Sequence, residues 1–229
     1  RPNPFVDGAP FQQVLRLRQG EIVIKAGELD EAVTLTIWVD ANNPVIRVEV
    51  DSVMPRDVKV ALDIWRTTRR ELTGKELNSA YGLHGAPFRV YVHPDTVVED
   101  HQDRIVWYHR NEESIWENNL RHQRLEGLIG KLTDPLLGRT FGGRIEGPGL
   151  VNEDATRLRS SAPRKEFDLS IYPHSAQTDS VSRWLDQLDR SAARCQAQSL
   201  EAARQRHLAW WDAFWNRSWI RVSGSPDLE

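Results

Sequence analysis

The sequence predicts a mainly β protein, with antiparallel strands packed as a sandwich and helices near the C-terminus. Apolar and polar residues alternate in many short runs, which is the pattern of strands that bury one face. Asn, Asp, Gly and Pro separate these runs, as they do at turns between strands. The apolar spacing changes to the helical three or four residues only after about Thr178.

The first half of the chain carries the clearest strand patterns. Residues 14–24 predict a hairpin that turns at Gly20. Residues 33–39 predict a strand with four aliphatic side chains on one face and Trp38, with two threonines, on the other. The four are Val33, Leu35, Ile37 and Val39. Further alternating runs predict strands at residues 46–50, 58–64, 88–92, 104–109 and 167–172.

The alternation lapses between residues 111 and 165. Ser114 and Glu117 fit a capping box, which predicts a short helix that continues through Leu125. A glycine-rich stretch, residues 138–143, then reads as a loop. A long irregular segment inside a compact domain either carries function or covers a sheet edge.

Helical spacing begins after residue 178. One apolar stripe weakens over residues 191–199 and then resumes, so the pattern predicts either two helices or one long helix with a weak middle. The stripe consists of Val181, Trp184, Leu185, Leu188, Leu200, Ala203, His207 and Trp211. A short strand is expected at residues 219–222.

The last predicted helix is unusually aromatic. Residues 207–220 contain Phe214 and four of the nine tryptophans, Trp210, Trp211, Trp215 and Trp219. Trp210 lies about 100° around the helix from Trp211, so the apolar surface is too wide for contact on one side only. We therefore expect this helix to join the domain before it to a module after it.

The domain organisation follows from these patterns. We expect a β-sandwich domain over residues 1–175, linker helices over 176–217, and the start of a following module over 218–229. The first residue is Arg1 rather than methionine, and the end is rich in Ser, Gly and Pro, so we expect a processed or excised chain.

Composition disfavours several classes of function. The net charge is −3 with both signs interspersed, so we expect no nucleic-acid partner. No run of about 18 apolar residues occurs, so we expect no membrane partner. Cys195 is the single cysteine and the seven histidines are scattered, so neither a disulfide nor a metal site is expected. No phosphate loop or dinucleotide motif is present, and we expect no cofactor.

Chemistry is most plausible where aromatic and polar residues mix, after residue 106. Saccharides need an aromatic face for their C–H surface and both donors and acceptors for their hydroxyls. The candidate substrate-binding residues are Trp107, His109, Arg110, Asn111, Trp116 and Arg139. In a strand, Trp107 and His109 would share one face and Tyr108 and Arg110 the other. The alternative is structural, with Trp107 in the core and Arg110 paired with a glutamate.

No catalytic residue is predicted. Glu112 and Glu113 are adjacent, so on a strand they point to opposite faces, whereas two hydrolase carboxylates must face one substrate.

Three segments carry a resemblance to a known family. WYHRNEESIWENNLRHQRLEG, DPLLGRTFGG and HLAWWDAFWNRSWI resemble the N-terminal region of a group of bacterial proteins with a domain of unknown function. That region is similar to the β-supersandwich domain that precedes the catalytic barrel in α-L-fucosidase-like inverting glycoside hydrolases.

The resemblance implies a non-catalytic N-terminal domain of a glycoside hydrolase. Its linker helices would join an intramolecular (α/α)6 barrel, and the sandwich could line the cleft for a carbohydrate substrate. The catalytic carboxylates of that superfamily belong to the barrel, so the resemblance assigns none to this chain. It also favours a periplasmic or secreted protein. Two alternatives stay open: an autonomous carbohydrate-binding module, and a purely structural or interaction sandwich.

Overall fold

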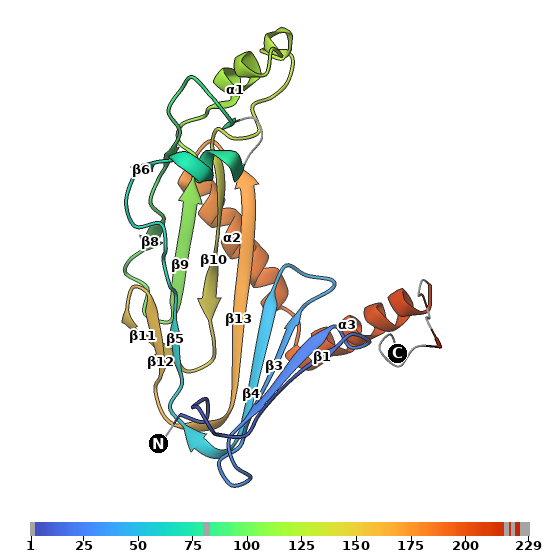
Figure 1. Cartoon of the computed structure of the whole chain (residues 1–229). Helices are drawn as coiled ribbons and strands as arrows, with labels where there is room; N and C mark the ends of the chain where they lie inside the picture. Colours follow the sequence, from blue (N-terminus) through green and yellow to red (C-terminus); the bar gives the residue numbers. More distant parts are fainter. Residues whose placement is uncertain (1–2, 80–82, 218–219, 221–222, 225–229) are drawn as a thin grey trace. The chain divides into compact units, whose positions relative to one another are not determined.

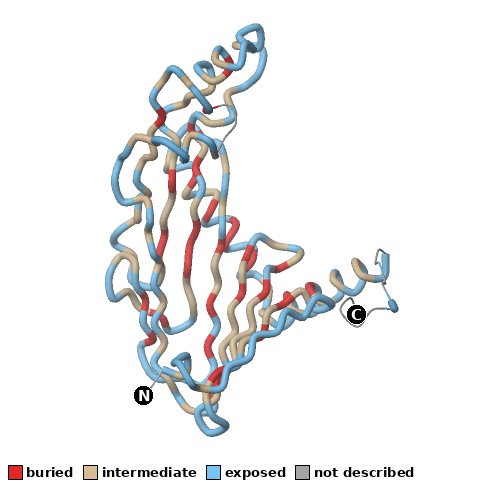
Figure 2. The backbone as a smooth tube through the Cα atoms, viewed as in Figure 1, coloured by how far each residue is buried: buried red, intermediate tan, exposed pale blue. Residues whose placement is uncertain are grey.

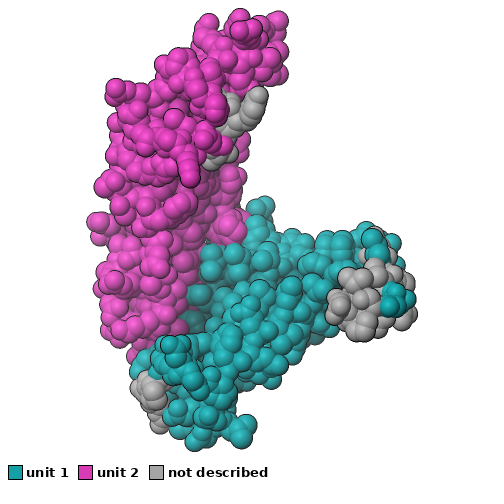
Figure 3. Space-filling model, in the orientation of Figure 1, with its two compact units in different colours: residues 1–57, 162–171, 192–229 teal, residues 58–161, 172–191 magenta. Residues whose placement is uncertain are grey.

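The computed structural model describes residues 3–79, 83–217, 220 and 223–224. Strands dominate it, which confirms the predicted mainly β class (Figure 1). The residues group into two compact units (Figure 3). Unit 1 comprises residues 1–57, 162–171 and 192–229, and unit 2 comprises 58–161 and 172–191.

Most strands belong to one sheet. Unit 1 contains β1 (Phe11–Arg16), β2 (Glu21–Ala26), β3 (Val33–Val39) and β4 (Ile46–Arg56). Unit 2 contains β5 (Lys59–Ala61), β6 (Arg70–Glu71), β7 (Tyr91–Val92), β8 (Thr96–Val98), β9 (Arg104–Arg110), β10 (Arg139–Glu146), β11 (Leu150–Asp154) and β12 (Arg157–Ser160). β13 (Arg164–Gln177) contributes residues to both units. The eight-stranded antiparallel sheet has the order β1-β2-β3-β4-β13-β10-β9-β8. β11-β12-β5 and β6-β7 form two smaller sheets.

The predicted hairpin and the strand over residues 33–39 are both present. β1 pairs with β2 around the turn at Gly20, and β3 has the bounds that the alternation predicted. Both faces of β3 contribute buried side chains, since Val33 on the aliphatic face is 4% exposed. Trp38 is 1% exposed, whereas Val39 is 61% exposed. The reason is that a helix covers the Trp38 face, since the ring of Trp38 lies 4.7 Å from that of His207.

Two helices, α2 (Val181–Gln196) and α3 (Leu200–Trp215), follow β13, so the two-helix alternative is correct. The break falls at residues 197–199, where the polar sequence weakened the stripe. Ser199 caps α3 by accepting a hydrogen bond from the backbone N–H of Ala202.

The core of unit 2 uses both faces of β9. On one face Tyr108 packs near Trp184 of α2, which is fully buried. β11 and β12 also contact β9, and they contribute the buried residues Leu150 and Leu158. Buried residues, red in Figure 2, recur along the long strands of the sheet. β9 is therefore covered by a helix and by a small sheet.

The glycine-rich stretch is a strand rather than a loop. Gly142 and Gly143 lie within β10, opposite Tyr108 and Trp107 of β9. A Cβ on Gly143 would come within 3.0 Å of the Trp107 ring and 2.7 Å of the Tyr172 carbonyl oxygen. These glycines are needed for close packing, which a turn-based interpretation of the sequence could not detect.

The expected helix after residue 114 exists but begins later and ends sooner. α1 (Trp116–His122) has Ile115 at its N-cap without a side-chain cap, so the capping box was wrong. The Ser114 hydroxyl instead accepts a hydrogen bond from the backbone N–H of Trp116. Arg124 has φ of 59°, so the chain has left the helix before Leu125. The described part of unit 2 also contains the short 3-10 helices η1 (Gly74–Ser79) and η3 (Glu126–Leu128).

Some predictions fall outside the described residues, among them Trp219 and most of the strand expected at 219–222. The domain boundaries at residues 175 and 217 stay a prediction. No helix in the described part of the chain is both long and apolar enough to span a membrane.

Candidate functional site

Arg110, the last residue of β9, holds the backbone around it together. Its Nη1 donates to the Gly138 carbonyl oxygen at 3.0 Å and to the Thr140 hydroxyl at 2.8 Å. Its Nη2 donates to the Thr178 carbonyl oxygen at 3.1 Å. Within the described residues the partners of Arg110 are thus backbone and hydroxyl oxygens, and the alternative of a glutamate partner is not what the structure has.

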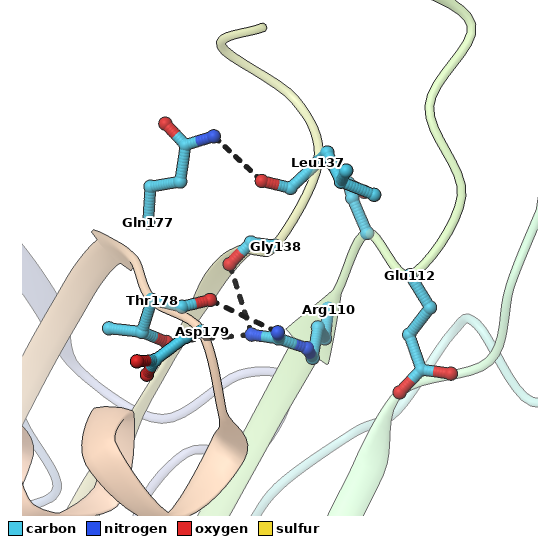
Figure 4. A pocket seen from close by; sticks show the side chains of 8 residues that line it. Arg110, Glu112, Leu137, Gly138, Gln177, Thr178 and Asp179 are labelled. Carbon is cyan, nitrogen blue, oxygen red and sulfur yellow. Dashed lines mark hydrogen bonds between the residues drawn. The ribbon is translucent and has the colours of Figure 1, made fainter.

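A polar hollow of about 530 Å³ lies beside this guanidinium (Figure 4). We call it the Arg110 hollow. Its lining comprises Arg110, Asn111, Glu112, Leu137, Gly138, Gln177, Thr178 and Asp179. The side chains supply donors and acceptors with one apolar residue, a mixture that suits hydroxyl-rich ligands.

Several polar groups of the hollow have capacity to spare. Gln177 Nε2 donates to the carbonyl oxygens of Asp134 and Leu137, both at 2.7 Å, which leaves its Oε1 available. In the described part of the chain, the side chains of Asn111 and Glu112 make no hydrogen bond or ion pair. The Arg110 hollow therefore has hydrogen-bond donors and acceptors that no protein group among the described residues occupies.

A second polar cluster occupies the opposite face of β9. His109 Nδ1 lies 2.9 Å from Asp95 Oδ1, and Arg66 Nε donates to the same oxygen at 2.6 Å. The Asp95 side chain is 4% exposed. The ring of Phe141 lies 5.1 Å from that of His109. His109 and Arg110 thus serve different faces, as the alternation of the strand predicted.

The remaining candidates are dispersed. Trp107 is half-buried, with its ring against Gly143. Trp116 begins α1 and is also half-buried. Arg139 Nε donates to the Pro135 carbonyl oxygen at 3.0 Å and stabilises the turn before β10. Of the six predicted residues, only Arg110 and Asn111 line the hollow together.

Two further polar residues, Asp134 and Arg144, serve the fold. Burial acts to raise the pKa of Asp134, but hydrogen bonds from the Ser114 hydroxyl and from two backbone N–H groups outweigh it and lower that pKa. This carboxylate therefore organises a turn. Arg144 pairs with Glu146 and with Asp189 of α2. No group of three or more His, Cys, Asp or Glu side chains in the described residues is placed to hold a metal ion.

With this geometry established, comparison with known proteins identifies the family. A family model described as DUF5703_N, "Domain of unknown function (DUF5703)", matches residues 1–220. The chain belongs to this family. This agrees with the domain-of-unknown-function group that the sequence resembles. No curated protein matches it.

One solved structure is similar in part to this DUF5703_N domain. It is named "Putative kojibiose phosphorylase from human microbiome". The two share 9% sequence identity with a TM-score of 0.46. The match covers 90% of this chain and 23% of that one, so the chain spans about a quarter of the length of that protein.

Several residues of the Arg110 hollow were not predicted from the sequence. Gln177 and Thr178 lie at the end of β13, far from Arg110 in sequence, and no local motif marks them. Asp95 was missed for the same reason. Its signal is a single Pro-Asp step at residues 94–95, which is too common at turns to indicate a buried carboxylate.

Proposed function

We propose that this DUF5703_N chain is a non-catalytic N-terminal domain of a glycoside hydrolase and that it supports an (α/α)6 catalytic barrel. The observation that carries the proposal is the aliphatic face of the unit 1 sheet. Seven of its side chains are only partly covered, none of them buried: Ile22, Ile24, Leu35, Ile37, Ile46, Val48 and Val50.

Exposure on this face differs strongly between the β13 side and the β1 edge. On β13, Phe167 and Leu169 are 5% and 9% exposed. At the other edge, on β1, Phe11 and Leu15 are 61% and 62% exposed. Register places Leu15, Ile22 and Ile37 side by side on the same face. Free-standing domains rarely expose contiguous apolar patches above a few hundred Å², so this difference favours a cover supplied by another module.

The aromatic end of α3 supports the same proposal. Trp210 stacks on Phe214 with ring centroids 5.5 Å apart, and it is 38% exposed. Trp215 Nε1 donates to the Leu17 carbonyl oxygen at 2.8 Å, which ties the helix end to the β1–β2 turn. A rigid, partly exposed aromatic surface is well suited to a permanent interface because little side-chain entropy is lost on contact.

A reconstitution experiment tests this role. The chain is titrated into the separately produced catalytic barrel of its parent enzyme, and binding and the Tm of the barrel are measured. We expect binding and a raised Tm, because a partner that binds only the folded state stabilises it. Leu15→Lys should weaken binding, since it places a charge on the apolar face. Leu29→Lys, at a side chain that is 94% exposed in the β2–β3 turn, is the matched control. If the barrel neither binds the chain nor gains stability from it, the supporting role is wrong.

We also propose that the Arg110 hollow contributes carbohydrate contacts at the rim of the parent enzyme's cleft. The spare amide of Asn111 and carboxylate of Glu112 carry this finer proposal, since both can bond to hydroxyls. In the full-length parent, Asn111→Ala should raise KM without lowering the Tm. Asn118→Ala, on the exposed surface of α1, is the control. Unchanged KM values for both Asn111→Ala and Glu112→Ala would refute a role of the Arg110 hollow in substrate binding.

A further inference from the structure

The most exposed aromatic side chain among the described residues is Trp65, at 82%. It lies in an extended segment after β5 in which burial alternates. Leu62, Ile64 and Arg66 are partly buried, whereas Asp63 and Trp65 are exposed. The backbone therefore directs the indole outward by strand-like alternation. An exposed Trp gains none of the hydrophobic free energy that burial would give, and a ligand that covers the ring would supply it.

Arg66 is fixed beside this indole. Its guanidinium carbon lies 5.0 Å from the Trp65 ring centroid and 5.3 Å from that of Phe141. Arg66 Nε donates to Asp95 Oδ1 at 2.6 Å, and the Asp95 backbone N–H donates to the Arg66 carbonyl oxygen at 2.8 Å. Both the main chain and the side chain of Arg66 are thus anchored on one buried residue. Its terminal nitrogens are left in a defined position.

This cluster has donors to spare and no matching acceptor. In the part of the chain that the structure describes, Arg66 uses only Nε, so Nη1 and Nη2 have no protein partner. His109 Nδ1 is already used by Asp95, so the free donors of this cluster are those of Arg66. The carboxylate of Asp95 is already shared by Arg66 and His109. A ligand that satisfies these donors must bring acceptor oxygens, and a carboxylate fits a guanidinium best.

We infer that Trp65, Arg66 and Phe141 form a binding site for a saccharide that carries a carboxylate, such as a uronic acid unit. The C–H face of the sugar stacks on the exposed indole, and its carboxylate accepts from Nη1 and Nη2 of Arg66. Phe141, which is 36% exposed, borders the same guanidinium. The saccharide class rests on the proposed function, because aromatic and guanidinium groups also bind nucleic acids. Nucleic-acid binding depends on many phosphate contacts, whereas this cluster offers a ligand one guanidinium, which disfavours that alternative.

Calorimetry on the 229-residue chain tests the inference. The probes are an oligogalacturonate and its methyl ester, which share every C–H face and differ in charge. We expect the acid to bind and the ester to bind at least about tenfold more weakly, a difference that corresponds to about 1.4 kcal/mol. Trp65→Ala should weaken binding of the acid about tenfold, whereas Trp65→Phe should retain part of it. Arg66→Lys should reduce the discrimination between acid and ester.

Two controls make the result decisive. Trp210→Ala removes a partly exposed tryptophan of unit 1 and should leave binding unchanged. Dextran sulfate tests whether any polyanion suffices. Equal affinity for acid and ester, equal loss in Trp65→Ala and Trp210→Ala, or dextran sulfate binding as tight as the oligogalacturonate would each overturn the inference. So would the absence of binding by the unsubstituted chain. The barrel reconstitution does not involve Trp65, so it can succeed or fail independently.

Discussion

The turn that joins β1 to β2 should be intolerant of a single methyl group at Gly20. This residue has φ of +62°, and a Cβ built on it would lie 1.9 Å from Nε1 and 2.2 Å from Cε2 of Trp211. The left-handed backbone costs about 1 to 2 kcal/mol for a residue with a side chain. Overpacking a rigid ring adds about 1 to 3 kcal/mol. Gly20→Ala should therefore lower the free energy of unfolding by about 2 to 5 kcal/mol.

Urea unfolding followed by tryptophan fluorescence measures this change. Gly8→Ala is the matched control, because Gly8 also has a positive φ, of 85°, but a Cβ there would meet nothing within 4 Å. It should show only the backbone cost of about 1 to 2 kcal/mol.

A double variant separates the two costs at Gly20. Trp211→Leu removes the clashing ring, and the indole nitrogen it deletes has no hydrogen-bond partner among the described residues. In this background Gly20→Ala should cost no more than Gly8→Ala. Equal effects of Gly20→Ala and Gly8→Ala in the unsubstituted chain would show that the contact with α3 does not govern the turn.

Four further predictions concern pH, the close packing at Gly138 and a buried carboxylate. Burial lowers the pKa of His207 below its usual 6.5, so the unfolded chain takes up the proton first and the free energy of unfolding should fall as pH drops below 6.5. Burial raises the pKa of Glu49 above its usual 4.5, so this residue acts with the opposite sign, and its contribution should fall as pH rises above 4.5. Urea midpoints measured across this pH range test both residues. The fall in stability below pH 6.5 should disappear in His207→Gln, and the fall above pH 4.5 should disappear in Glu49→Gln. A pH dependence that survives its substitution contradicts the role given to that residue. Gly138→Ala would bring a Cβ within 2.7 Å of the Thr178 carbonyl oxygen. It should therefore disturb the Arg110 hollow and lower the Tm. A Tm equal to that of the unsubstituted chain would refute the close approach. Asp95→Asn removes the buried charge that Arg66 and His109 share, and it should destabilise unit 2 by about 3 kcal/mol in urea unfolding. A change below about 1 kcal/mol would show that this carboxylate contributes little.

The sequence predicted the strands of unit 1 well because each alternates cleanly over five or more residues. It could not predict that Trp38 is fully buried on the face opposite the aliphatic side chains, because alternation does not show what covers each face. The deciding contact, between Trp38 and His207, joins residues that are far apart in the sequence. Alternation alone cannot place such a helix.

The candidate site was predicted only in part, for a similar reason. The pattern around residue 110 correctly separated the two faces of β9, and Arg110 and Asn111 do line a polar hollow. Their neighbours come from the end of β13, and the cluster on the opposite face depends on Asp95. The end of β13 and Asp95 are both far from Arg110 in the sequence, and no local motif marks either of them. The glycines within β10 were predicted to form a loop, because a strand that packs closely against its neighbours can be as rich in glycine as a turn.

The position of β1 has a practical consequence for handling this domain. β1 is the first strand of the large sheet, all six of its residues are exposed, and its outer backbone groups face no strand among the described residues. An uncovered edge of this kind is a template for pairing with another chain. Arg16 is the single charged side chain on it. Concentrated solutions of the separated domain should therefore form edge-to-edge aggregates, and a second charge on β1 is the most direct way to keep it monomeric.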